Sequence, residues 1–349
     1  MMNRKVAVVM AGGSGERFWP VSTPDRPKQF LNLARNDSPL IRDAVHRAAV
    51  LTGKDNSFVV TGSHLKEKTM FACPELPKFN LWTEPHKRNT AGALVWVVAN
   101  IIAHFGDDWP ETAVAVLTAD QRIEPESEFI HTANKALDAA IEHGAIVTIG
   151  IRPDRPETGF GYIEVGEKVD DVHKINRFCE KPDLATAEEM IKSGNYLWNS
   201  GMFFFTVATF MAELQKAQPD MAESTRSIAG FLAQGEDAAA ADTFALLPNL
   251  SIDYAVMERT KRAMVIEASF HWDDLGSWDA VSRSFNPDLD GNVNVGSARF
   301  VDTQSSVVYN DNASQEVSIL GMEDVIVVVT ERKILVCPKS RAQDVKTLT

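Results

Sequence analysis

The chain has 349 residues, a length that predicts one large domain with a smaller one, or two comparable domains. Its hydrophobic share of 44% and charged share of 24% exclude disordered, collagen-like and fibrous proteins. With 35 Lys and Arg against 48 Asp and Glu, the net charge of −13 argues against a dominant surface for nucleic acid or anionic membrane. The longest apolar stretches, 91–99 and 325–329, are shorter than the ~18 residues of a membrane span, so we expect no such segment.

The three cysteines, Cys73, Cys179 and Cys337, are widely spaced and form no C-x-x-C pair. The sequence therefore supports neither a disulfide framework nor a zinc site. The basic start of the chain is followed by only six apolar residues before Gly12, which is too few for a signal peptide. We expect reduced thiols in a cytoplasmic protein.

The first 150 residues alternate short apolar runs with segments of helical periodicity. Strands are predicted at 5–10, 57–61, 113–117 and 145–149, and helices at about 40–52, 90–104 and 127–143. This alternation is typical of βαβ units, which form a parallel sheet with helices on both faces. The predicted class is therefore α/β, with a Rossmann-like, mostly parallel sheet whose ligands bind beyond the carboxyl ends of the strands.

The remainder of the chain is less regular. Helices are predicted at 184–192, 207–216 and around 238–241. Turn-rich sequence follows Trp278, and short β-type runs stand at 306–309, 318–320 and 325–329. We predict a large α/β domain at 1–285 and a small β-rich domain at 286–349.

A glycine-rich loop, Ala-Gly-Gly-Ser-Gly-Glu-Arg at residues 11–17, directly follows the first predicted strand. Glycines let backbone N–H groups approach a phosphate chain closely, and Arg17 can fork across its oxygens. A Walker A loop would need Gly-Lys-Ser/Thr, and a dinucleotide fingerprint would need glycine in place of Phe18, so both fail. The alternative is that the glycines serve only the turn.

Two N-terminal blocks resemble the signature of the sugar nucleotidyltransferases. Their Trp-Pro at 19–20 and Pro-Lys-Gln-Phe-Leu at 27–31 are similar to the mannose-1-phosphate guanylyltransferases, or GDP-mannose pyrophosphorylases. Further matching blocks follow in the family's order at 84–85, 88–91, 118–120, 158–163, 178–182, 198–203, 251–254, 272–278 and 336–339. The resemblance therefore covers the whole chain.

The resemblance implies that a phosphate oxygen of mannose 1-phosphate attacks the α-phosphorus of GTP, giving GDP-mannose and pyrophosphate. Such a reaction needs two polyanions held in line and cations to stabilise the developing charge. By this resemblance Arg17 would stabilise the departing pyrophosphate and Lys28 would bridge the reacting phosphates. The nucleotide-binding residues of the loop would be Ala11, Gly12, Gly13, Ser14 and Gly15.

Asp120 follows an apolar strand, in a position where α/β sheets present ligand-binding residues. A lone Asp there is often only a helix cap. The resemblance pairs it with Asp274 on Mg²⁺, which prefers oxygen ligands. Relatives usually read Pro-Ala-Asp-His at this block, whereas this chain has Thr118 and Gln121. The role of that histidine is therefore lost or replaced.

On the sugar side, the resemblance points to Gly161, Glu180, Lys181 and Asn199. Gly161 would permit a close approach of the pyranose, Glu180 and Asn199 would hydrogen-bond hydroxyls, and Lys181 would neutralise the sugar phosphate. The alternative for Glu180 and Lys181 is an ordinary solvated charge pair. Trp198 and Trp272 fit a core role as well as a functional one.

On the base side, the resemblance places Glu84 to accept hydrogen bonds from guanine, and Arg88 and Asn89 near the nucleotide phosphates or ribose. No serine-hydrolase elbow is present, because Ser200 lacks a glycine two residues before it.

Relatives carry a short β-helix that supports dimer contacts, so a homodimer is expected. Some longer relatives add a mannose-phosphate isomerase domain, for which this sequence has no room, so we expect one activity. Two rival functions remain. One is the same chemistry on another hexose 1-phosphate or nucleoside triphosphate. The other is a regulatory subunit that binds nucleotide sugar without catalysis, which would be expected to lack Arg17, Lys28 or a metal aspartate.

Overall fold

The protein is represented by a computed structural model, which describes residues 4–13, 15–34 and 38–349. The chain divides into two compact units. The first unit takes in the chain up to Ala11 and residues 45–118 and 123–271. The second consists of residues 12–44, 119–122 and 272–349.

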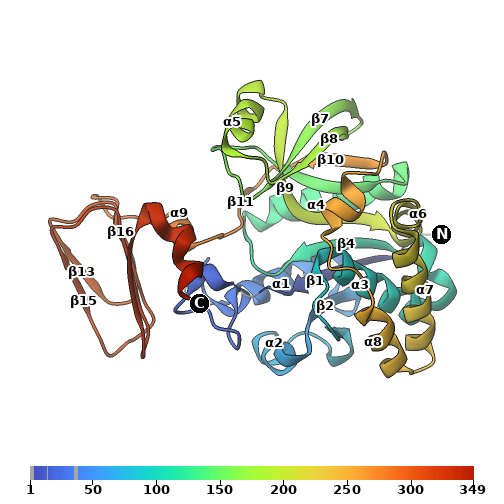
Figure 1. Ribbon diagram of the computed structural model, residues 1–349, viewed down its shortest axis with the longest axis horizontal. Coiled ribbons are helices and arrows are strands. Elements are labelled where there is room, and N and C mark those ends of the chain that lie inside the picture. The colour runs from blue at the N-terminus through green and yellow to red at the C-terminus, as the bar shows by residue number, and fades with distance from the viewer. Residues whose placement is uncertain (1–3, 14, 35–37) are drawn as a thin grey trace. The chain divides into compact units, whose positions relative to one another are not determined.

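A mixed sheet forms the centre of the first unit, and in the described chain it has nine strands in the order β3-β2-β1-β4-β9-β6-β10-β8-β7 (Figure 1). The strands are β1 (Lys5–Ala11), β2 (Ser57–Gly62), β3 (Leu81–Glu84), β4 (Ala113–Thr118), β6 (Ile146–Ile151), β7 (Gly161–Val169), β8 (Val172–Glu180), β9 (Tyr196–Thr206) and β10 (Ala263–Glu267). The strands β3, β2, β1 and β4 are parallel, and β9 runs antiparallel to both β4 and β6. Ala11, Glu84 and Thr118 therefore end their strands at one edge of the sheet.

The helices of the first unit pack around this sheet. They are α2 (Lys66–Ala72), α3 (Asn89–Phe105), α4 (Glu126–His143), α5 (Leu184–Ser193), α6 (Val207–Ala217), α7 (Pro219–Ala233) and α8 (Asp237–Ala245). Figure 1 shows α7 and α8 beside α3, and α4 contacts β4, β6 and β9. Three elements cross the division between the units along the chain: α1 (Leu40–Thr52), β5 (Arg122–Glu124) and β11 (His271–Asp273).

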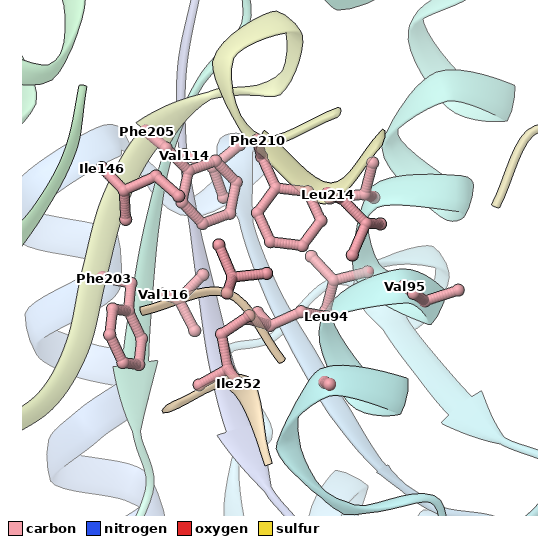
Figure 2. Close-up of a cluster of buried hydrophobic side chains, with 14 of the residues drawn as sticks. Leu94, Val95, Val114, Val116, Ile146, Phe203, Phe205, Phe210, Leu214 and Ile252 are labelled. Carbon is pink, nitrogen blue, oxygen red and sulfur yellow. The ribbon is translucent and has the colours of Figure 1, made fainter. Parts of the chain in front are cut away.

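The core of the first unit follows from the alternation of side chains along the strands. Val114 and Val116 on β4, and Phe203 and Phe205 on β9, are two residues apart and so point to the same face of the sheet. That face is covered by apolar side chains from α3 and α6, which Figure 2 shows around them. Ile252 joins the same cluster, which fixes the chain segment just before Asp253.

The most apolar helix passes a simple test for a membrane span. The segment 89–111 is long and apolar enough to cross a membrane by length and composition alone, a test that a buried core helix also passes. Residues 91–99 of α3 are all buried within the first unit. The packing of this helix in the core accounts for its apolar composition.

The second unit contains a small β-helix-like domain. Its elements are α9 (Val281–Ser284), β12 (Val293–Val295), β13 (Ala298–Val301), β14 (Val307–Asn310), β15 (Val317–Leu320), β16 (Val325–Val329), β17 (Ile334–Pro338) and a 3₁₀ segment at Lys339–Leu348. Successive coils stack in parallel, β12 on β14 on β16 and β13 on β15, and β17 closes the first stack antiparallel. The α/β class with a small C-terminal β-helix-like domain is thereby confirmed.

The glycine-rich loop region belongs to this second unit. Phe18 and Trp278 are fully buried and meet edge to face with ring centroids 5.1 Å apart. The Trp278 indole donates to the carbonyl oxygen of Trp19 (2.8 Å) and packs on Tyr309 of β14. Residues 12–44, which the sequence analysis placed in the α/β domain, thus share a core with the C-terminal strands.

Candidate active site

The glycine-rich loop separates into a structural glycine and two exposed ones. Gly15 has a φ of +60°, and a Cβ there would lie 2.6 Å from the Cβ of Lys28, so only glycine fits. Gly12 and Gly13 are exposed, and within the described residues a Cβ on either would meet no atom within 4 Å. Contacts among the described residues therefore do not require glycine at these two positions. Ser14 lies outside the described residues.

The neighbours of the loop differ in exposure. Ala11 is buried at the end of β1, and its carbonyl oxygen accepts a hydrogen bond from the hydroxyl of Thr61 (2.9 Å). Arg17 is exposed, so its guanidinium can reach an anion without first giving up buried contacts. Ala11 therefore supports the strand end, and Arg17 is the accessible cation after the loop.

Lys28, which the resemblance assigns to the phosphates, is a buried and paired cation. Its side chain is 9% exposed, and its Nζ donates to Oδ2 of Asp120 (3.0 Å) and to the main-chain oxygen of Asp274. A buried ammonium is costly unless it is paired, and these two oxygens supply the pairing. The structure therefore brings Lys28, Asp120 and Asp274, far apart in the sequence, into one cluster.

Gln121 occupies the position at which relatives usually have histidine. It is 6% exposed, and its Oε1 accepts a hydrogen bond from Nε1 of Trp272 (2.8 Å). Gln121 directly follows Asp120, and Trp272 lies two residues before Asp274. This hydrogen bond therefore joins the two chain segments that carry the acidic residues.

The resemblance assigns Asp120 and Asp274 to a divalent cation. In the part of the chain that the structure describes, no group of three or more His, Cys, Asp or Glu is placed to hold a metal ion. Two carboxylates are what Mg²⁺ typically takes from a protein when phosphates and water complete its shell. Among the contacts of the described residues, the Asp120 carboxylate is paired with the Lys28 ammonium.

The predicted sugar-binding residues are all in the first unit, where the strand register brings three of them into one row. Gly161 of β7 pairs with Glu180 of β8. The neighbouring pair, Tyr162 with Trp198 of β9, sets Asn199 next along the same row. Gly161, Glu180 and Asn199 are thus adjacent across three strands although the chain separates them widely.

Glu180 is buried above Gly161. Its side chain is 7% exposed, and a Cβ on Gly161 would lie 2.7 Å from its Oε2, so glycine makes room for this carboxylate. The Lys181 ammonium, on a side chain that is 59% exposed, lies 2.5 Å from Glu180 Oε1. A buried carboxylate with an exposed cation differs from the solvated pair of the alternative interpretation.

Asn199 leads to a residue to which the sequence analysis gave no role. The Asn199 Nδ2 donates to Oδ1 of Asp253 (3.3 Å), and its Oδ1 lies 2.8 Å from the hydroxyl of Thr148. Burial raises the pKa of Asp253 to about 6, and the nearby charge of Glu180 adds to this rise. The only sequence signal was its place in the matching block at 251–254.

On the predicted base side, Glu84 ends β3, and its burial raises the pKa of the carboxyl to about 7. Arg88 points elsewhere: its Nε and Nη2 both donate to the carbonyl oxygen of Ala245 at the end of α8. Asn89 has a φ of +58°, and its side chain accepts from the N–H of Thr90 (2.8 Å). Arg88 and Asn89 therefore make structural contacts at two helix ends.

Two models of known protein families match this chain. A model described as nucleotidyl transferase matches residues 6–290, and one described as a MannoseP isomerase/GMP-like beta-helix domain matches residues 296–349. The chain belongs to the nucleotidyl transferase family.

Similar members of this family span the chain almost completely. The mannose-1-phosphate guanylyltransferase of Sinorhizobium fredii is 35% identical over 100% of this chain and 68% of its own length. The alginate biosynthesis protein AlgA of Pseudomonas aeruginosa is 34% identical over 98% of this chain and 70% of its own. The resemblance to mannose-1-phosphate guanylyltransferases is thereby confirmed.

A solved structure agrees. A Thermus thermophilus protein, recorded as mannose-1-phosphate geranyltransferase, superposes with a TM-score of 0.88 at 34% identity, covering 99% of this chain and 98% of its own. This likeness supports the nucleotidyl transferase fold through both the catalytic part and the β-helix part.

Proposed function

We propose that this chain transfers GMP from GTP to α-D-mannose 1-phosphate, producing GDP-mannose and pyrophosphate. The observation that carries the proposal is the cluster of Lys28, Asp120 and Asp274, in a chain similar over its whole length to mannose-1-phosphate guanylyltransferases. A buried cation beside two acidic residues suits phosphoryl-group chemistry, in which charge must be stabilised while two anions react.

Each phosphate-binding residue has a task in this reaction. The backbone N–H groups of Gly12 and Gly13 hold the triphosphate, which the open space beside both residues permits. Lys28 lies against the reacting phosphates and reduces the repulsion between the two anions. Arg17 stabilises the charge that develops on the leaving pyrophosphate.

Mg²⁺ is the proposed cofactor, with Asp120 and Asp274 as its protein ligands. When bound, the ion neutralises phosphate charge and orients the reacting groups. Lys28 contacts the Asp120 carboxylate and the main-chain oxygen of Asp274, so this ammonium lies beside both of the proposed ligands.

Recognition of the organic parts is assigned to the first unit. Glu180 and Asn199 hydrogen-bond the sugar hydroxyls, Lys181 pairs with the sugar phosphate, and Gly161 leaves space for the Glu180 carboxylate. Glu84 accepts from guanine N1–H and the exocyclic amine, a donor pair that adenine lacks.

We also propose a homodimer formed through the C-terminal domain. Ile334 and Val336 alternate along β17 and so share one face, on which they are 63% and 60% exposed. Apolar side chains on a strand face favour contact with a second copy. Light scattering that gives the mass of one chain at micromolar concentration would exclude this dimer.

The decisive experiment is pyrophosphate release with Mg²⁺, measured for four nucleoside triphosphates against mannose, glucose and N-acetylglucosamine 1-phosphates. We expect the dominant signal for GTP with mannose 1-phosphate, and its loss in Asp120→Ala and Asp274→Ala. A dominant signal for another pair would overturn the specificity and retain the chemistry. Binding of nucleotide sugar without any turnover would favour the regulatory subunit.

A further inference from the structure

Asp253 begins an unusual turn that is firmly anchored. It is the first residue of a π-helical turn, Asp253–Met257, a geometry that occurs frequently at functional sites. The preceding residues are fixed to the start of α3: the N–H of Ile252 donates to the hydroxyl of Thr90 (2.9 Å), and the N–H of Ala91 donates to the carbonyl of Leu250 (3.1 Å). The backbone that leads into Asp253 is therefore held in place, and its carboxyl accepts from the Asn199 amide.

The orientation of the Asn199 amide is set by its neighbours. The N–H of Gly201 can only donate, so the atom that faces it at 3.3 Å must be Oδ1 of Asn199. Nδ2 then faces Asp253 and gives it one of its two hydrogens. Within the part of the chain that the structure describes, Asn199 has one N–H left for a ligand, and its Oδ1 already lies against Gly201 and Thr148.

The charge at Asp253 is not explained by its contact with Asn199. A neutral acceptor would satisfy the amide equally well, and a carboxylate near Glu180 is disfavoured by repulsion and burial. Burial and Glu180 raise the pKa of Asp253, whereas Lys181 and the hydroxyl of Ser251 lower it. A second carboxylate beside Glu180 becomes favourable when a neutral ligand donates hydrogen bonds to it.

Resting on the proposed function, we propose that Asp253 binds a ring hydroxyl of the sugar directly, beside Glu180 and Asn199, and so selects the hexose. A hydroxyl can donate to the Asp253 carboxylate and at the same time accept the remaining N–H of Asn199. Glu180 provides the acceptor for a second hydroxyl. The site therefore recognises the positions of two hydroxyls rather than the sugar phosphate alone.

The test is a thermodynamic cycle of the double-mutant type. It combines substitution of Asp253 in the protein with removal of single hydroxyl groups from the sugar phosphate. Binding of mannose 1-phosphate and its 2-, 3-, 4- and 6-deoxy analogues is measured by calorimetry for the full chain, Asp253→Ala and Asp253→Ser. In the unaltered chain, loss of the recognised hydroxyl should weaken binding roughly 10- to 100-fold, the range for a hydrogen bond to a charged group. We call the loss of affinity of each deoxy analogue, relative to mannose 1-phosphate, its hydroxyl penalty. In both Asp253 variants the penalty for the recognised hydroxyl should fall to about 2-fold or less, and the penalties for the other three hydroxyls should remain. Glu258→Gln, which removes an exposed charge just after the same turn, should behave as the unaltered chain.

The outcomes separate this inference from the proposed function. If Asp253 only holds Asn199, the variants bind every analogue more weakly by one common factor, and all four penalties persist, which overturns the proposal. Unfolding midpoints identify any variant that fails to fold, and Asp253→Asn then supplies a closer isostere. If mannose 1-phosphate binds but no pyrophosphate is released, the proposed function is wrong while the hydroxyl penalties still decide the role of Asp253.

Discussion

At the scale of single residues, Glu84 and Asp120 are carboxylates in different environments. Asp120 touches the Lys28 ammonium, whereas partial burial raises the pKa of Glu84 to about 7, against an ordinary value of 4.5. A carboxyl with a pKa near 7 ionises at little free-energy cost near neutral pH, and its carboxylate can then accept hydrogen bonds from the N–H donors of a base such as guanine.

The first prediction concerns the affinity for GTP. Glu84→Gln should weaken GTP binding roughly 10- to 100-fold above pH 7, because a charged acceptor of two donors is lost. In the unaltered chain GTP affinity should rise between pH 6 and pH 8 relative to the variant, since the carboxylate accepts better once ionised. Calorimetric titration at several pH values measures both effects, with Glu67→Gln, exposed on α2, as the control. Parallel pH profiles for the variant and the unaltered chain would refute the assignment of guanine to Glu84.

The same shift has a consequence for stability. A raised pKa means that the folded chain holds this proton more tightly than the unfolded chain does. The contribution of Glu84 to the free energy of unfolding therefore falls as pH rises from about 4.5 to about 7 and is constant beyond. Urea unfolding at pH 5 and pH 8 should show a smaller loss of stability in Glu84→Gln than in the unaltered chain.

The sequence alone predicted many of these site residues, but for some of them it did not predict the contacts that the structure shows. The family blocks pointed to Glu180 and Asn199, but the contact between Asn199 and Asp253 joins positions 54 apart and depends on the fold. Gly161 was expected to admit the sugar, and in the structure it admits the Glu180 carboxylate. Pair contacts of this kind carry no local sequence signal.

At the scale of elements, Arg88 supports a helix. Its guanidinium donates twice to the last carbonyl of α8, where a positive charge also complements the helix dipole. Arg88→Ala should lower the free energy of unfolding by ~1.5–3 kcal/mol, the range for hydrogen bonds to a charged group. The KM for GTP should stay within about twofold of normal, whereas a large rise would restore the nucleotide-binding role that the sequence suggested. Lys87→Ala, at an exposed neighbouring position, serves as the control.

The hydrogen bond between Gln121 and Trp272 predicts an effect on divalent cations. Trp272→Phe removes the indole donor and with it one tie between the segments of Asp120 and Asp274. We expect a loss of ~1 kcal/mol in stability, typical of one hydrogen bond. We also expect weaker binding of Mn²⁺ in the presence of GTP, which electron paramagnetic resonance can measure. In Trp109→Phe, a substitution in the first unit, Mn²⁺ affinity should be unchanged. If Trp272→Phe also binds Mn²⁺ with unchanged affinity, the hydrogen bond between Trp272 and Gln121 does not position Asp120 and Asp274.

Periodicity predicted most elements up to residue 151, because buried strands and amphipathic helices have strong local patterns. It did not predict that β9 enters the sheet antiparallel between β4 and β6, since strand direction is set by long-range pairing. The helix α7 and the short strand β3 were also absent from the prediction.

At the scale of the whole molecule, the compact units do not follow the order of the chain, because each is built from several separate segments. The family models meet between residues 290 and 296, close to the predicted boundary at 285. The second unit nevertheless unites residues 12–44 with the C-terminal strands through contacts such as Arg26 with Asp311 (2.9 Å), 285 positions apart. Local sequence cannot show such a union.

This union predicts the behaviour of a chain that ends at residue 290. The truncated chain keeps every strand of the large sheet, so hydrogen exchange in β1 and β4 should remain slow. Residues 16–34 lose Asp311, the partner of Arg26, and the core that they share with Tyr309, so their amides should exchange much faster than in the full chain. Pyrophosphate release should then fall sharply, because Lys28 lies within this segment.

A substitution within the full chain separates packing from chain length. Trp278→Ala removes a fully buried side chain that contacts Phe18 and Tyr309, so it should cost ~3–5 kcal/mol and expose the same segment to exchange. Phe71→Ala, at a 90% exposed position of the first unit, should leave exchange unchanged. If residues 16–34 stay protected in both the truncated chain and Trp278→Ala, the loop that carries Lys28 holds its shape without the β-helix-like domain. Rapid exchange in both variants would show that the segment carrying Lys28 needs the β-helix-like domain to hold its shape. The strands of that domain, which follow Asp274 in the chain, would then be a structural requirement for the proposed activity.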